Sequence, residues 1–431
     1  MRKLKYILLL AVLLLPLFQQ SEIAVAKNRP DLPVDLEGTL HGAPYRIRVP
    51  ENWNGTLLVY AHGYSMEPVL DPEVAFLGDT ALLEQGYALA ASGYRGAGYN
   101  VAEAIMDTKH LTDFFKRAVG KPNYTVLYGV SMGGAITLKS MEKFPGTYDG
   151  GIPLCSVASD NLKHTATRFT FALAYDATFG WLDSWGAVED VRDDIEFYGD
   201  VWFAKVHNEI LYPFEPGYPA NYARWEFIRL VSDLPAGGYY SYTGPVAMPP
   251  GVIALTYFMT ASRAELEARA GGRISENVDY VYSLSDTERD YLMSLDPSLD
   301  LDGMLAQMNA MTGFEADPWA EAYIRRYGEY RGRIHGPVLM AHNVEDPVTP
   351  VEGTTEYASL VNAAHREELL TRVYTDLPGH CNFTEEQVLA LFAAMDNWLE
   401  TGETPTPDAF PEALNFVHDF EPGPWPQPPS D

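Results

Sequence analysis

The sequence has little cysteine, few positive charges and, beyond its first residues, no long hydrophobic run. Of its 431 residues only Cys155 and Cys381 are cysteines; they match no zinc-binding spacing and permit at most one disulfide. The 30 Lys and Arg are outnumbered by 59 Asp and Glu, which gives a formal net charge of −29. A protein this acidic does not favour nucleic acid or an anionic membrane surface as a partner. After the amino terminus, no stretch approaches membrane-spanning length.

Residues 1–26 have the pattern of a secretory signal peptide. Basic residues come first, then an apolar run from Tyr6 to Phe18, then small residues ending at Ala26. The apolar run is about 13 residues long, whereas a membrane-spanning helix needs roughly 20. We therefore predict cleavage after Ala26 and a secreted or periplasmic protein, in a compartment where a disulfide persists.

The rest of the chain alternates between short apolar runs typical of strands and longer runs with helical spacing. The predicted strands are residues 36–41, 45–49, 56–61, 87–92, 125–128, 151–154, 337–341 and 369–374. The predicted helices are residues 73–84, 101–119, 131–144, 354–364 and 387–401. This alternation predicts an α/β fold with a mostly parallel sheet and helices on both faces.

One long segment interrupts the alternation. Residues 160–335 are rich in helical and aromatic patterns and show no strand–helix alternation. We predict that they form a helical lid or cap, inserted between strands 6 and 7 of a catalytic domain made of residues 27–159 and 336–404. Residues 405–431 hold eight prolines and are interpreted as an irregular strap or a disordered tail.

The strongest chemical signal is a Gly-x-Ser-x-Gly motif that runs from Gly129 to Gly133 and is centred on Ser131. The motif follows a predicted strand and opens a predicted helix, which is the setting of a nucleophile elbow. In such a turn the glycines remove Cβ atoms that would clash, and the adjacent helix N-terminus favours developing negative charge. We predict that Ser131 is a catalytic nucleophile.

A base and an acid for this nucleophile are expected after the seventh strand. His380 lies in a loop directly after the last predicted strand, where it can fold back over the sheet edge toward Ser131, and we predict that it is the general base. Asp346 follows the seventh predicted strand, and we predict that its carboxylate orients the imidazole. Glu345 and Asp376 are the alternatives for the acid.

Acyl transfer also needs two N–H donors that face the developing oxyanion. One is predicted to be the backbone N–H of Met132, the residue after the nucleophile, and the other that of Tyr64, in the loop after the third strand. Gly63 permits a close approach of that loop, and His62 is interpreted as a structural imidazole. The sequence contains no metal-binding pattern, phosphate-binding glycine loop or dinucleotide fingerprint, so we expect neither a metal nor a cofactor.

With these motifs the sequence resembles the α/β-hydrolase superfamily across residues 36–157 and 336–401. Ser131, Asp346 and His380 occur in that superfamily's chain order of Ser, acid and His. The resemblance implies the α/β-hydrolase fold and a two-step mechanism through an acyl-enzyme.

Residues 379–383, Gly-His-Cys-Asn-Phe, look like the His loop of secreted tannase-like and feruloyl-esterase-like enzymes. Those enzymes bridge the Cys after the His to a Cys beside the nucleophile. Here Val130 precedes Ser131, and Cys155 is left as the partner of Cys381. On this resemblance we predict a Cys155–Cys381 disulfide.

The predicted activity is that of a serine carboxylic-ester hydrolase acting on an apolar or aromatic ester, either a small molecule or a polyester chain. An exported aminopeptidase or proline-type peptidase on the same fold is the alternative, because acidic residues between Glu189 and Glu196 offer a site for a substrate ammonium. A third interpretation is a binding protein that kept the fold and lost catalysis, which the complete set of Ser, Asp and His disfavours. The oligomeric state stays open.

Overall fold

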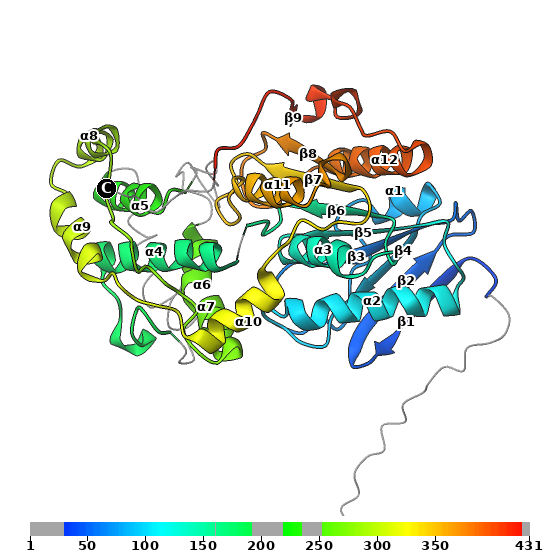
Figure 1. The fold of residues 1–431 in the computed structure, drawn as a ribbon, viewed down its shortest axis with the longest axis horizontal. Coiled ribbons are helices and arrows are strands. Elements are labelled where there is room, and N and C mark those ends of the chain that lie inside the picture. Colours follow the sequence, from blue (N-terminus) through cyan, green and yellow to red (C-terminus); the bar gives the residue numbers. More distant parts are fainter. Residues whose placement is uncertain (1–29, 160, 192–218, 235–251, 425–431) are drawn as a thin grey trace, which may run out of the picture.

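The computed structural model describes residues 30–159, 161–191, 219–234 and 252–424. The predicted signal peptide lies outside the described residues. Within them, the chain folds into a sheet with helices on both faces and a helical body beside it (Figure 1). No helix in this part of the chain combines the length and the apolar character needed to cross a bilayer.

Nine strands form one sheet in the order β1-β2-β4-β3-β5-β6-β7-β8-β9. The strands are β1 Val34–Leu40, β2 Ala43–Val49, β3 Thr56–Ala61, β4 Ala88–Ser92, β5 Tyr124–Val130, β6 Gly150–Leu154, β7 Val338–Asn343, β8 Leu370–Thr375 and β9 Phe416–Val417. The strands from β4 to β8 run parallel, whereas β1, β2 and β9 are antiparallel to their neighbours. This arrangement is the α/β-hydrolase fold, which confirms the predicted fold class.

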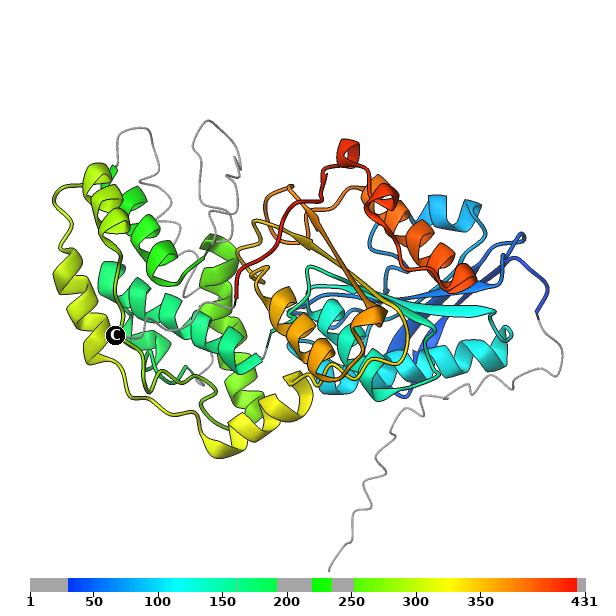
Figure 2. The ribbon, with the colours of Figure 1, turned by 45° about the horizontal axis from the view of Figure 1, so that its top comes forward.

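The central strands are buried on both faces, so their residues alternate between two hydrophobic cores. In β3, Leu57 and Val59 belong to one core, whereas Leu58 and Tyr60 belong to the other. Strands covered on both sides need such nearly continuous apolar runs. Figures 1 and 2 show α2, α3 and α11 on one face of the sheet and α1 and α12 on the other. These helices are α1 Asp79–Glu84, α2 Val101–Ala118, α3 Met132–Lys143, α11 Gly353–Ala363 and α12 Glu385–Thr401.

The helix predicted over residues 73–84 is shorter than the sequence pattern suggests. Only its last part is helical, as α1, and it begins after Gly78, which has a left-handed backbone with φ 69°. The preceding residues form an irregular segment that buries Val74 and Ala75 in the core beneath α12. In the first half of the predicted helix, burial of these apolar side chains in the core is therefore favoured over helix formation.

The carboxyl-terminal segment is more ordered than the predicted irregular or disordered tail. Its residues 416 and 417 form β9, which pairs antiparallel with β8 through Tyr374 and Thr375. Phe416 is buried there and packs on Phe410. Because β8 would otherwise be the edge of the sheet, β9 covers part of an exposed strand edge. Residues 425–431 lie outside the described part of the chain.

The segment between β6 and β7 forms a helical body with a hydrophobic core of its own. Its helices are α4 Asn161–Phe179, α5 Pro219–Val231, α6 Val252–Met259, α7 Ala261–Ala270, α8 Asp286–Leu295, α9 Leu301–Ala310 and α10 Pro318–Gly328. Aromatic side chains such as Phe169, Tyr175 and Trp225 pack together in this core. These aromatic residues therefore stabilise the helical body itself.

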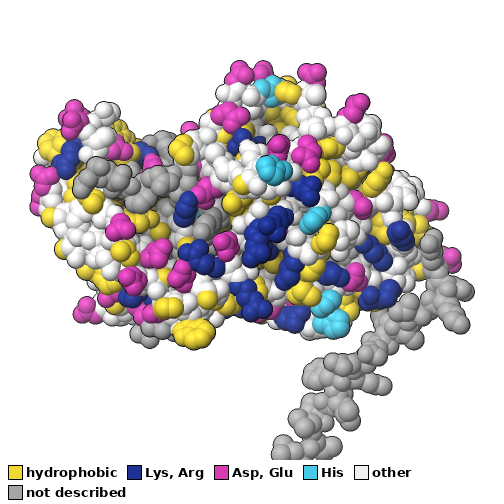
Figure 3. All heavy atoms as spheres, viewed as in Figure 1, with side chains coloured by type: hydrophobic (Ala, Val, Ile, Leu, Met, Phe, Trp, Pro, Cys, Tyr) yellow, Lys and Arg dark blue, Asp and Glu magenta, His cyan; other side chains and the backbone are white. Residues whose placement is uncertain are grey.

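Charge is unevenly distributed over the surface. Figure 3 shows Lys and Arg side chains gathered in the middle of the face formed by α2, α3 and α10. This cluster of basic side chains contrasts with the formal net charge of −29 of the whole chain.

Candidate active site

Ser131 occupies the turn between β5 and α3. Its backbone has φ 55° and ψ −118°, which L-residues rarely adopt. The neighbouring glycines allow this turn, because a Cβ on Gly129 would clash with the carbonyl of Gly133, and one on Gly133 with that of Ala61. The Ser131 N–H donates to the carbonyl of Leu154 at 3.0 Å, which ties the turn to the end of β6. The turn has the strained geometry expected of a nucleophile elbow.

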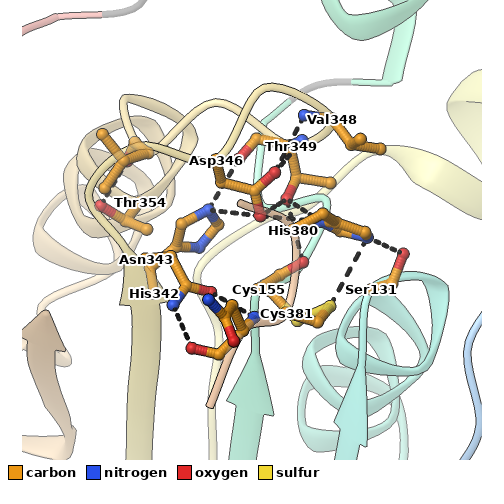
Figure 4. Close-up of polar contacts among 12 residues, drawn as sticks. Ser131, Cys155, His342, Asn343, Asp346, Val348, Thr349, Thr354, His380 and Cys381 are labelled. Carbon is orange, nitrogen blue, oxygen red and sulfur yellow. Dashed lines mark hydrogen bonds and ion pairs between the residues drawn. A yellow bond between two sulfur atoms is a disulfide. The ribbon is translucent and has the colours of Figure 1, made fainter. Parts of the chain in front are cut away.

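His380 joins Ser131 to Asp346, as Figure 4 shows. Its Nε2 lies 2.8 Å from Ser131 Oγ, and its Nδ1 lies 2.7 Å from Asp346 Oδ2. The three residues follow β5, β7 and β8, whose carboxyl ends meet at one edge of the parallel sheet. The structure therefore brings the predicted nucleophile, base and acid within hydrogen-bond distance of one another.

Asp346 is completely buried, and several donors hold its carboxylate. The backbone N–H groups of Val348 and Thr349 donate to Oδ1 at 2.9 and 3.0 Å, and Thr349 Oγ1 donates to Oδ2 at 2.8 Å. Burial acts to raise the pKa of Asp346, but the charge and hydrogen bond of His380, the charge of His342 and the Thr349 N–H outweigh it and lower the pKa. Asp346 is therefore ionised at neutral pH and fixed in one orientation.

The alternatives for the acid and the base are placed differently. Glu345 and Asp376 are both exposed, in contrast to the buried carboxylate that contacts the imidazole. The later histidines, His365 and His418, are exposed as well. Burial and contact thus separate the predicted acid and base from these alternatives.

The residues predicted to supply the oxyanion donors lie next to Ser131 or in a loop beside it. Met132 is the first residue of α3, so its N–H has no acceptor within the helix. A Cβ placed on Gly63 would lie 3.5 Å from Ser131 Cβ, which puts the loop after β3 directly beside the elbow. The next residue in that loop is Tyr64, whose hydroxyl lies 2.9 Å from the hydroxyl of Tyr257 in the helical body.

Cys155 and Cys381 form a disulfide with Cα atoms 5.2 Å apart. Cys155 comes directly after β6, and Cys381 comes directly after His380, so the bond tethers the His loop to the rim of the sheet. The same three residues are a group of potential metal ligands among the described residues. Because both sulfur atoms are in the disulfide, this group does not offer thiolates to a metal.

Removing the disulfide is expected to destabilise the protein and to lower its activity at temperatures where the sheet remains folded. The bond closes a loop with a sequence separation of 226 residues, for which chain entropy gives an upper figure of about 5 kcal/mol. Denaturant unfolding and activity can be compared between the native protein and a Cys155→Ala/Cys381→Ala variant, with and without a reductant. The reductant should affect only the native protein. Free thiols that alkylate in the unreduced, denatured protein would contradict the prediction.

Two buried polar residues in β7 support the site, although the sequence patterns alone do not single them out. Asn343 Nδ2 donates to the carbonyls of Leu377 and Asn382, at 3.1 and 2.8 Å, and so holds both ends of the His loop. His342 Nε2 lies 3.8 Å from the carboxylate of Asp346. An amide and an imidazole at the end of an apolar strand are uncommon because each needs a buried partner. Their position at the end of this strand is the sequence signal that could have identified them.

Two buried histidines, His164 and His342, and the half-buried His62 lie in or beside the site. Burial lowers the pKa of His62, His164 and His342 from the ordinary value of 6.5, and for His164 the charges of Arg168 and His380 add to the effect. The Nδ1 atom of His62 lies 2.7 Å from the carbonyl of Gly63, and its ring stacks on a buried tyrosine, which is a structural role. The folded protein therefore favours the neutral form of all three rings.

Stability is expected to fall when the pH drops below about 6.5. There the unfolded chain binds protons that these three rings do not, so the free energy of unfolding decreases by up to about 1.4 kcal/mol per pH unit for each histidine. Above this pH the rings are neutral in both states and have no effect. Denaturant unfolding at pH 7.5 and 5.5 measures the slope. His164→Gln should reduce it and the exposed-site control His365→Gln should not, whereas equal slopes in the two variants would refute the assignment.

Comparison with known proteins identifies two regions of similarity. A tannase-like family of unknown function matches residues 39–189, and a family of TAP-like proteins matches residues 318–410. The o-phthalyl amidase of Xanthobacter agilis is 24% identical over 458 residues, which cover 92% of each chain. The match to the tannase-like family agrees with the resemblance inferred from the His loop.

The solved structures that align with this chain include esterases and peptidases. Feruloyl esterase B from Aspergillus oryzae aligns with a TM-score of 0.40 and 16% identity, covering 86% of this chain and 80% of the esterase. An acylaminoacyl peptidase from Pyrococcus horikoshii aligns with a TM-score of 0.39 and 10% identity, covering 85% of this chain and 41% of the peptidase. The sheet order is that of the α/β-hydrolase fold, the chain is similar to tannase-like and TAP-like proteins over these two regions, and the matches support hydrolysis as its reaction.

Proposed function

We propose that this protein is an exported serine hydrolase that cleaves a carboxylic ester or amide through an acyl-enzyme on Ser131. The observation that carries the proposal is the continuous pair of hydrogen bonds from Ser131 Oγ through His380 to the buried carboxylate of Asp346. This arrangement lets the imidazole accept the serine proton while the carboxylate stabilises the imidazolium that forms.

The reaction would proceed in two steps. Ser131 Oγ attacks the acyl carbon as its proton passes to His380 Nε2, and the N–H groups of Met132 and Tyr64 stabilise the oxyanion. His380 then gives this proton to the leaving alcohol or amine, and the acyl group stays on Ser131 as an ester. Water that transfers a proton to the same imidazole hydrolyses this ester, and the proton returns to Ser131.

Ester hydrolysis is the first candidate reaction, because the family that matches residues 39–189 is tannase-like and tannases cleave esters. Amide hydrolysis is the second candidate, and the similarity to an o-phthalyl amidase along nearly the whole chain favours it. The peptidase alternative relied on an acidic segment, of which Asp193, Asp194 and Glu196 lie outside the described residues. It therefore stays a prediction.

A fluorophosphonate probe and matched substrates test the proposal. The probe should label Ser131, as peptide mapping by mass spectrometry can show. A nitrophenyl ester and a nitroanilide with the same benzoyl group then compare ester with amide cleavage, and aminoacyl and prolyl nitroanilides test the peptidase alternative. Turnover of the anilides alone would make the protein an amidase. Failure both to label Ser131 and to hydrolyse any substrate would contradict the proposal.

A further inference from the structure

Arg168 is a buried cation of the helical body. It lies on α4 with only 7% of its surface exposed. Within the described part of the chain it has no carboxylate partner, and its contact is a cation–π interaction with the ring of Phe258, whose centroid lies 4.8 Å from Cζ. Burying a guanidinium without a compensating charge costs free energy. We therefore expect Arg168 to have a function that offsets this cost.

The other deeply buried arginine of the helical body shows what a structural role looks like. Arg263 Nε donates to the carboxylate of Glu267 at 3.0 Å, and its Nη1 donates to the carbonyl of Val188 at 2.7 Å. It also stacks on the ring of Phe169, at 4.9 Å. Both arginines therefore have a phenylalanine ring, but only Arg263 has a carboxylate among the described residues.

The surroundings of Arg168 connect it to the loop after β3, which lies beside Ser131. Phe258, on which Arg168 stacks, contacts Tyr64 of the oxyanion loop with ring centroids 5.9 Å apart. One helical turn before Arg168 on α4 is the buried His164. Arg168 is therefore linked through one ring, Phe258, to the loop that lies beside Ser131.

Nothing described around Arg168 supplies a negative charge to it. Burial raises the pKa of Tyr64, and raises that of Tyr99 to about 12, so both nearby phenols are neutral at physiological pH. Glu265, which also faces Tyr64, accepts from Arg269 Nε at 2.7 Å and from the Tyr99 N–H at 3.0 Å. This carboxylate is therefore already engaged.

We propose that Arg168 binds a second, ionised carboxylate on the acyl part of the substrate. This inference rests on the proposed function and gives it a substrate class, the monoesters or monoamides of an aromatic dicarboxylic acid. One carboxyl of the acid forms the scissile bond, and the other pairs with Arg168, whose planar guanidinium suits bidentate recognition. The rings of Phe258 and Tyr64 provide an apolar surface for the aromatic ring that joins them.

Four methyl esters test this assignment: methyl benzoate, which is uncharged, and the monomethyl esters of phthalic, isophthalic and terephthalic acid. The wild-type protein is expected to prefer at least one carboxylate-bearing isomer over methyl benzoate in kcat/KM. Arg168→Met should reduce kcat/KM for that isomer by about 10- to 100-fold, the value of a hydrogen-bonded charge pair, with little change for methyl benzoate. Arg168→Lys should retain part of the preference because it keeps the charge.

Arg273→Met is the matched control, because Arg273 also stacks over a phenylalanine ring of the helical body, Phe314 at 5.5 Å. It should leave the preference among the four esters unchanged. Equal losses for methyl benzoate and the charged esters in Arg168→Met would show a merely structural role and overturn the inference. A wild-type protein that hydrolyses methyl benzoate and no charged isomer would overturn it as well, while the proposed function would stand.

Binding separates this inference from the proposed function. In a Ser131→Ala background no ester is turned over, and calorimetry can measure the dissociation constant of each monomethyl ester with and without Arg168→Met. We expect weaker binding of the preferred charged ester by about the same 10- to 100-fold in the double variant. Unchanged binding would refute the role of Arg168. Absence of fluorophosphonate labelling of Ser131 in the wild-type protein would instead refute the proposed chemistry.

Discussion

Replacing Ser131 by alanine is expected to reduce kcat by about 10⁴- to 10⁶-fold and to leave the fold intact. The oxygen of this hydroxyl is the atom that would form the acyl-enzyme. The positive φ of 55° at this position is strained for serine and alanine alike, so the substitution adds no new backbone penalty. The loss can be measured with the substrate on which the wild type is most active. Short assays suit the wild type, and long incubations suit the variant.

Ser140→Ala is the control for this variant. Ser140 is a buried serine of α3, the same helix that Ser131 precedes, and it is distant from the His loop in sequence. We expect it to retain wild-type kcat and unfolding behaviour. If Ser131→Ala kept even a tenth of the wild-type activity, Ser131 would not be the nucleophile.

The layout of the candidate site is predictable from sequence because it depends on local rules. Gly129 and Gly133 signal a turn that only glycine permits, and an apolar strand before it together with a helix after it fixes where Ser131 points. In a parallel sheet all strands end at the same edge, so residues that follow β7 and β8 must lie near the elbow. The position of Asp346 and His380 in the chain therefore implies their position in space.

The residues that support the site are harder to predict because they act through long-range packing. Asn343 holds the ends of a loop that is more than thirty residues away in sequence, and no local pattern indicates that pairing. The irregular segment around Val74 differs from the predicted helix for a similar reason, because burial against α12 outweighs helical spacing. Arg168 is an extreme case, since an arginine on a helix is ordinarily exposed and only the packing of α6 against α4 shows that it is buried.

Asp346→Asn is expected to lower kcat by about 10⁴-fold, which is the effect of imposing the wrong histidine tautomer. The N–H groups of Val348 and Thr349 donate to Oδ1 and should retain an oxygen at that position. The amide nitrogen of the asparagine would then face His380 Nδ1. An imidazole that accepts there carries its proton on Nε2 and cannot accept the proton of Ser131.

Glu345→Gln is the matched control, because it removes a neighbouring carboxylate that is exposed. We expect it to change kcat by less than about threefold, in keeping with the small effect of surface charges. Circular dichroism and denaturant unfolding should show that both variants are folded, and fluorophosphonate labelling should slow only in Asp346→Asn. Equal losses in the two variants, or a larger loss in Glu345→Gln, would transfer the orienting role to Glu345. Since Asp346 is the carboxylate that is both buried and 2.7 Å from the imidazole, the greater loss is expected there.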